Sequence, residues 1–158
     1  MIADRPNIQD AALLTILNLD ESKHLFYPCG SRYFGYFSPE SDYDFFFEKS
    51  RDVSAYLLDN CFVAANMHSC YMDVNTLGIF SSGQVHVMEV KSAKNRMAVQ
   101  DYIFTERKKS ESPDFRPPKG DRDWWNKRYC EIFPGEYEMP MTAEERRQAR
   151  EESRGAIL

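Results

Sequence analysis

The fold of this chain is decided by residues 29 to 48, which read CGSRYFGYFSPESDYDFFFE. The segment before them, residues 25 to 29, is short, apolar and aromatic, which predicts a buried strand that ends where Gly30-Ser31 begins a turn. Residues 31 to 37 are compatible with one or two helical turns. Residues 42 to 48 predict a second strand, so the stretch is expected to run strand, short helix, strand.

Two carboxylates stand at the beginning of the second expected strand. Asp42 and Asp44 are two residues apart, and because side chains alternate along a strand, both should lie on one face. Two close negative charges repel unless a cation lies between them, and Mg²⁺ prefers carboxylate, water and phosphate oxygens as ligands. The pair therefore predicts a metal-dependent site for phosphoryl or nucleotidyl transfer.

The turn between the strands offers a second half to such a site. Gly30 allows the backbone to come close to a ligand, and Ser31, as the expected N-cap of the short helix, offers a hydroxyl and nearby N–H groups. Together they predict a cradle for a triphosphate. Arg32 follows directly and either reaches a phosphate or is simply solvated.

Outward from this stretch, the patterns of apolar residues predict an α+β domain with a mixed sheet flanked by helices. The expected elements are helices at residues 8–19, 51–60, 93–109 and about 124–133, a β-hairpin with arms at 71–80 and 85–90, a loop at 110–121 that is the best candidate for a mobile segment, and a charged, solvated helix at 142–154. We therefore expect one domain over residues 1–141 and a helical tail over 142–158.

Composition narrows the class of protein. Hydrophobic residues make up 42% of the 158 positions, with eleven Phe and nine Tyr, which predicts a dense core. The formal net charge of −5 argues against a broad basic face for duplex DNA. The chain has no apolar run of about 18 residues and no secretory signal pattern, so we expect a cytoplasmic protein without membrane contact.

Residues 30–35 (GSRYFG), followed by 41–45 (SDYDF), resemble the signature of the DNA polymerase β nucleotidyltransferase superfamily, in its small GSR…G…SDxD form. The resemblance covers residues 25 to 48 and implies a nucleotidyltransferase-like fold. It further implies that Gly30 and Ser31 bind the triphosphate, that Asp42 and Asp44 hold Mg²⁺ or Mn²⁺, and that a third acid on a later strand completes the site. The small size suits a bacterial or bacteriophage member, in the latter case acting in the host cytoplasm.

For the third acid, the second arm of the hairpin places Glu89 where that family usually has an acid, most often Asp. Asp73, at the start of the first arm, is the rival. His86 should point to the face opposite Glu89. Lys91, just past Glu89, is expected at the end of the sheet that carries the predicted metal site, where it would bind the triphosphate or remain solvated.

These observations lead to an expected function. The chain would transfer a nucleoside monophosphate from an NTP to an acceptor hydroxyl, with Asp42, Asp44 and Glu89 as the metal-binding and catalytic acids. The acceptor is left open among RNA, including tRNA, protein and small molecules. The alternatives are a catalytically inactive protein of the same fold that binds a nucleotide, RNA or protein partner, and a small structural or regulatory domain whose acids face water.

Overall fold

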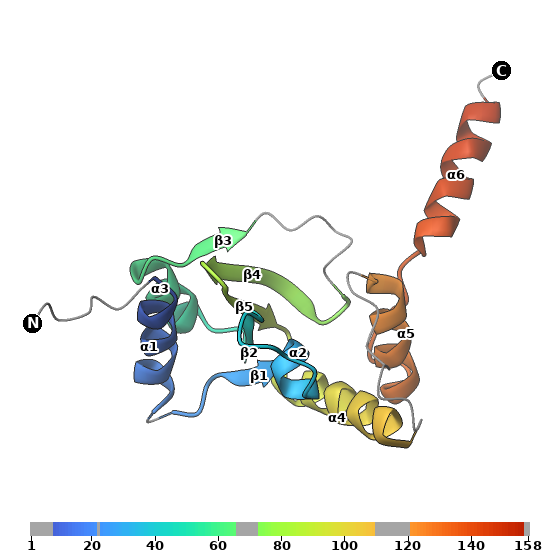
Figure 1. Cartoon of the computed structure of the whole chain (residues 1–158). Helices are drawn as coiled ribbons and strands as arrows, with labels where there is room; N and C mark the ends of the chain where they lie inside the picture. The colour runs from blue at the N-terminus through green and yellow to red at the C-terminus, as the bar shows by residue number, and fades with distance from the viewer. Residues whose placement is uncertain (1–7, 22, 66–72, 110–120, 157–158) are drawn as a thin grey trace, which may run out of the picture.

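The computed structural model describes residues 8–21, 23–65, 73–109 and 121–156. Its centre is a five-stranded sheet in the order β1-β2-β5-β4-β3, in which only the central pair, β2 and β5, runs parallel (Figure 1). The strands are β1 (Tyr27–Cys29), β2 (Tyr43–Glu48), β3 (Val63–Ala65), β4 (Thr76–Ser82) and β5 (Val85–Val90). The helices are α1 (Ile8–Asp20), α2 (Gly30–Phe34), α3 (Arg51–Asp59), α4 (Ala93–Lys109), α5 (Arg122–Ile132) and α6 (Ala143–Ala156).

The expected α+β class, with a mixed sheet flanked by helices, is confirmed. The predicted helices and strands are present, most of them with bounds shifted by one or two residues. The first arm of the hairpin, expected at residues 71–80, is β4 and begins only at Thr76. Ser50 caps α3 by accepting a hydrogen bond from the Val53 N–H at 3.3 Å. The edge strand β3 was not expected. Ser31 is not the N-cap of α2, because the helix already begins at Gly30 and Cys29 is the capping residue. The expected mobile loop lies almost wholly outside the described residues.

Helices cover both faces of the sheet, and this explains the unbroken apolar run in β2. Phe47 packs on one face with α1 and α3, where Ile16 and Leu57 are buried. Phe46 packs on the other face, against Val90 of β5 and Met97 near the start of α4. Neighbouring residues of β2 therefore both enter a core, and each buried Phe contributes roughly 1.5–3 kcal/mol.

The helix α5 docks beside α4 through aromatic side chains. Tyr129 is fully buried there, with Trp124 and Trp125 partly buried around it. The Arg96 guanidinium lies 4.3 Å from the centre of the Trp125 ring, and Arg128 lies 4.1 Å from that of Trp124. Trp125 thus joins α5 to α4 through Arg96, and Trp124 packs against the same buried cluster, while its contact with Arg128 lies within α5.

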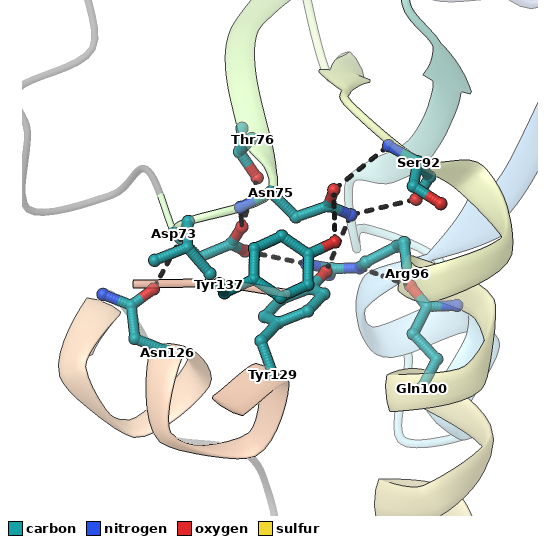
Figure 2. Close-up of polar contacts among 10 residues, drawn as sticks. Asp73, Asn75, Thr76, Ser92, Arg96, Gln100, Asn126, Tyr129 and Tyr137 are labelled. Carbon is teal, nitrogen blue, oxygen red and sulfur yellow. Dashed lines mark hydrogen bonds and ion pairs between the residues drawn. The ribbon is translucent and has the colours of Figure 1, made fainter. Parts of the chain in front are cut away.

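A buried polar network joins the start of β4 to α4 and to the segment around α5 (Figure 2). Asp73 Oδ2 pairs with Arg96 Nη1 at 3.1 Å, while its Oδ1 accepts hydrogen bonds from the Asn75 N–H and the Thr76 hydroxyl, each at 2.9 Å. The Asn75 side chain bonds both backbone groups of Ser92. Arg96 is only 5% exposed, so its charge depends on these partners for stabilisation.

The helix α6 extends away from the sheet and buries none of its residues (Figure 1). The Thr142 hydroxyl accepts from the Glu145 N–H at 3.1 Å, as a capping residue does. The Ala143 N–H donates to the Asp123 carboxylate at 3.0 Å, which ties this end of α6 to the start of α5. No helix within the described ranges is both long and apolar enough to cross a membrane.

Replacing Arg96 with methionine should lower the free energy of unfolding by about 3–5 kcal/mol, because the buried Asp73 carboxylate is left unpaired. Urea denaturation followed by circular dichroism measures this loss. The exposed Arg150, changed in the same way, should alter stability by no more than about 0.5 kcal/mol. Adding Asp73→Asn to Arg96→Met should restore part of the loss. Equal losses for Arg96→Met and Arg150→Met would contradict this role.

Candidate functional site

The Gly-Ser turn meets the second carboxylate at one end of the sheet. Cys29, the last residue of β1, pairs with Asp44 of β2, so Gly30 lies directly beside that aspartate. A Cβ atom on Gly30 would stand 2.3 Å from Asp44 Oδ2. Gly30 also has a φ of 69°, in the left-handed region that favours glycine. The close approach of carboxylate and backbone therefore requires glycine at this position.

The first carboxylate and a histidine lie at the same end. The register of β2 and β5 pairs Asp44 with His86, which places these two side chains next to each other on one face. His86 Nε2 lies 3.6 Å from Asp42 Oδ2, and the two side chains are 36% and 53% exposed. Asp42, Asp44 and His86 therefore lie at the same end of the sheet as the turn at Gly30 and Ser31, with Asp42 open to solvent.

Arg32 is committed to the loop that carries Asp42, so the expected contact with a phosphate is not supported. Its Nε donates to the Asp42 carbonyl at 3.3 Å, and its Nη2 donates to the Ser41 carbonyl at 3.0 Å. The guanidinium also lies 3.7 Å from the centre of the Tyr43 ring and 4.8 Å from that of Phe37. A planar fork with several donors suits this position, and it makes Arg32 a positioning residue.

Glu89 does not join Asp42 and Asp44, and the expectation that it lies beside them is wrong. Glu89 pairs with Phe47, three residues further along the strands than the pair of Asp44 and His86. Because side chains alternate between the two faces of a sheet, a separation of three residues places Glu89 on the face opposite Asp44. There its Oε2 accepts a hydrogen bond at 2.8 Å from the hydroxyl of Ser54 on α3. The hairpin was predicted correctly, but its register against β2 was not.

Lys91 and Asp73 also belong elsewhere. Lys91 follows the last residue of β5, about 16 Å along the strand from His86 at the usual rise per residue. Its N–H donates to the Asn75 carbonyl at 2.8 Å. Asp73 lies beyond the pair of Thr76 and Val90, at this same far end, with both carboxylate oxygens engaged. Neither residue can complete a site with Asp42.

The donor groups at the Asp42 end fit a divalent ion that shares its coordination with a ligand. Mg²⁺ is commonly held by one or two carboxylates together with waters and substrate phosphates, and Asp42 and Asp44 supply such a pair. Among the described residues, no three His, Cys, Asp or Glu side chains stand ready to enclose an ion on their own. Asp42 and Asp44 could therefore hold such an ion only together with water or ligand oxygens.

Cys29 borders the site but takes no part in its chemistry. Burial raises the pKa of its thiol to about 12, against the opposing effect of the Arg96 charge. The thiolate is the form that acts as a nucleophile or metal ligand. At neutral pH Cys29 therefore remains a protonated, buried side chain.

His86 is the site residue that sequence reasoning missed. The sequence did predict that His86 alternates with the buried Val85 and Val87 and points to the face opposite Glu89. Only the register of β5 against β2 shows which of the two faces carries the aspartates.

Comparison of the chain with protein-family models, with curated proteins and with solved structures finds no match in any of the three. The function of the site therefore has to be inferred from its residues and their geometry.

Alanine at Gly30 should cost more stability than alanine at Gly35. Both positions have φ in the left-handed region, which costs a residue with a Cβ roughly 1–2 kcal/mol. A Cβ at Gly35 meets nothing within 4 Å, whereas at Gly30 it collides with Asp44. We expect Gly30→Ala to lose about 1–3 kcal/mol more in urea denaturation. Equal losses would show that the carboxylate moves aside without cost.

Proposed function

We propose that this chain is a metal-dependent nucleotidyltransferase that moves a nucleoside monophosphate from an NTP to an acceptor hydroxyl and releases pyrophosphate. The observation that carries the proposal is the contact between the Gly30 turn and Asp44, with Asp42 at the same end of the sheet. Two carboxylates beside a Gly-Ser turn could share a divalent ion with water and phosphate oxygens, which is the coordination that a metal-bound triphosphate uses.

Each residue then has a defined task. Gly30 lets the Asp44 carboxylate lie against the backbone of the turn, and Ser31 would offer a hydroxyl donor beside it. Asp42 and Asp44 would hold Mg²⁺ or Mn²⁺, which when bound neutralises charge on the transferred phosphate and leaving pyrophosphate. Arg32 keeps the Asp42 loop in place through its carbonyl groups. The acceptor, an RNA such as tRNA, a protein or a small molecule, would approach from the exposed side of Asp42.

One observation favours the second candidate, a protein of the same architecture that binds a nucleotide, RNA or protein partner without turnover. The described site offers two carboxylates, and the position across from Asp44 is His86 in place of a third acid. Glu89 is held by Ser54 on the opposite face. A two-carboxylate site is sufficient to bind a metal–nucleotide complex, whereas turnover also demands activation of the acceptor hydroxyl.

Both candidates assume that Asp42 and Asp44 bind a nucleotide together with a metal ion. Calorimetric titration with each of the four NTPs, with and without Mg²⁺, tests this assumption. Binding should require the metal and disappear in the double variant Asp42→Asn/Asp44→Asn. The matched control is Asp52→Asn/Asp59→Asn, which removes the same charge from exposed positions of α3 on the other side of the sheet. Retained binding in the first variant, or lost binding in the control, would count against the site.

Turnover separates the two candidates. The protein is incubated with α-labelled NTP and fractions of RNA and protein, beside Asp42→Asn/Asp44→Asn. The enzyme should leave label on one class of acceptor, and the variant should leave none. Metal-dependent binding by the wild type with no label in any fraction would favour the binding protein.

A further inference from the structure

All four arginines of α6 lie on one side of that helix. α6 runs from Ala143 to Ala156 and buries none of its residues. Successive side chains of a helix are rotated by about 100°, so the arginines fall within an arc of roughly 100° and all four glutamates fall outside it. The arginines are Arg146, Arg147, Arg150 and Arg154, and the glutamates are Glu144, Glu145, Glu151 and Glu152. The helix therefore has a basic side and an acidic side.

Three of these arginines form a row, here called the arginine face: Arg146, Arg150 and Arg154. They recur every four residues, about 6 Å apart along the helix axis. The fourth arginine, Arg147, is paired with two glutamates of the acidic side. Arg146 donates one hydrogen bond from Nη1 to the Met141 carbonyl at 2.8 Å. Arg150 and Arg154 are exposed and have no ion-pair partner among the residues that the structure describes, so the arginine face has donors available for an anionic ligand.

The arginine face extends away from the rest of the protein. α6 is tied to the start of α5 at Ala143 and projects from there away from the sheet (Figure 1). Arg154 lies about 16 Å further along the helix axis. At physiological ionic strength, interactions between exposed charges are largely screened beyond about 8 Å. The formal net charge of −5 of the whole chain therefore does not decide which ligands this face attracts.

The composition of α6 argues against a membrane surface and against a second copy of the chain as its partner. A helix that lies on a membrane needs an apolar face, and a coiled coil needs an apolar seam. The apolar residues of α6 are three alanines, Ala143, Ala149 and Ala156, which are too small for either contact. An acidic protein would need carboxylates at a matching spacing on a fixed surface. A single nucleic acid strand instead offers a continuous and adaptable row of phosphates.

We propose that the arginine face of α6 binds the phosphate backbone of a single-stranded RNA. The planar guanidinium suits phosphate because it presents two parallel N–H donors to two oxygens, and one row of such groups suits one strand. The choice of RNA over single-stranded DNA rests on the proposed function, because each ribose of RNA carries a 2′-hydroxyl that can serve as an acceptor.

Fluorescence anisotropy of a labelled single-stranded RNA, without NTP or divalent metal, measures this contact. The triple variant Arg146→Gln/Arg150→Gln/Arg154→Gln should bind at least about tenfold more weakly at about 50 mM salt. The dependence of log K on log salt should become shallower by about 2, because each phosphate contact with a single strand contributes about 0.7. Gln is a good helix former and α6 buries no residue, so the circular dichroism spectrum should not change.

The matched control is Lys23→Gln/Arg51→Gln/Lys94→Gln, which removes the same charge from exposed positions outside α6. This control should bind the RNA as the wild type does. Equal losses in the two triple variants would show that only the net charge matters and would overturn the inference. A wild type that binds no RNA would also overturn it, and an acidic protein would then be the partner that fits the arginine face.

Transfer of label separates this inference from the proposed function. RNA and DNA of the same sequence, each below saturation, are incubated with α-labelled NTP and Mg²⁺. Label should enter the RNA, and the triple variant of α6 should transfer less of it. Label in the DNA but not in the RNA would overturn the choice of RNA. RNA binding that requires the arginine face, with no label transferred, would overturn turnover at Asp42 and Asp44 and leave the RNA contact standing.

Discussion

The parallel pairing of β2 with β5 is the constraint on which the rest of the structure depends. Both strands lie in the centre of the sheet and are covered by helices on each face, so every side chain along them is assigned to one of two environments. The register that pairs Asp44 with His86 also pairs Phe47 with Glu89. One register therefore determines which polar groups share a site and which residues pack or bond against α3.

The two ends of this strand pair carry acids that differ in burial and in hydrogen bonding. Asp73, at the far end, is buried and has both oxygens satisfied by Arg96, Asn75 and Thr76, as a charge removed from water must be. Asp42, at the near end, is half exposed and has His86 as its neighbour. The first acid is part of a buried network that joins β4 to α4, and the second is open to solvent.

At the end of the sheet that carries Asp42 and Asp44, the positions of the two carboxylates depend on the backbone as much as on side chains. Gly30 lets the Asp44 carboxylate lie against the turn, and Arg32 grips the carbonyl groups of the loop that presents Asp42. Both arrangements fix where the carboxylates stand before any ligand binds. Such prior ordering would reduce the entropy cost of the metal–nucleotide binding that we propose.

The sequence by itself determined the elements and the first half of the site, because these depend on local rules. Helical periodicity located α1, α3 and α4, and the strand alternation together with the Gly-Ser turn placed Gly30 near Asp44. The edge strand β3 is three residues long, too short for a periodic pattern. Only the tertiary structure decided that His86 stands where Glu89 was expected and that Lys91 and Asp73 lie at the other end. Strand register and the partners of a buried charge are set by contacts between residues far apart in the chain, which local patterns do not encode.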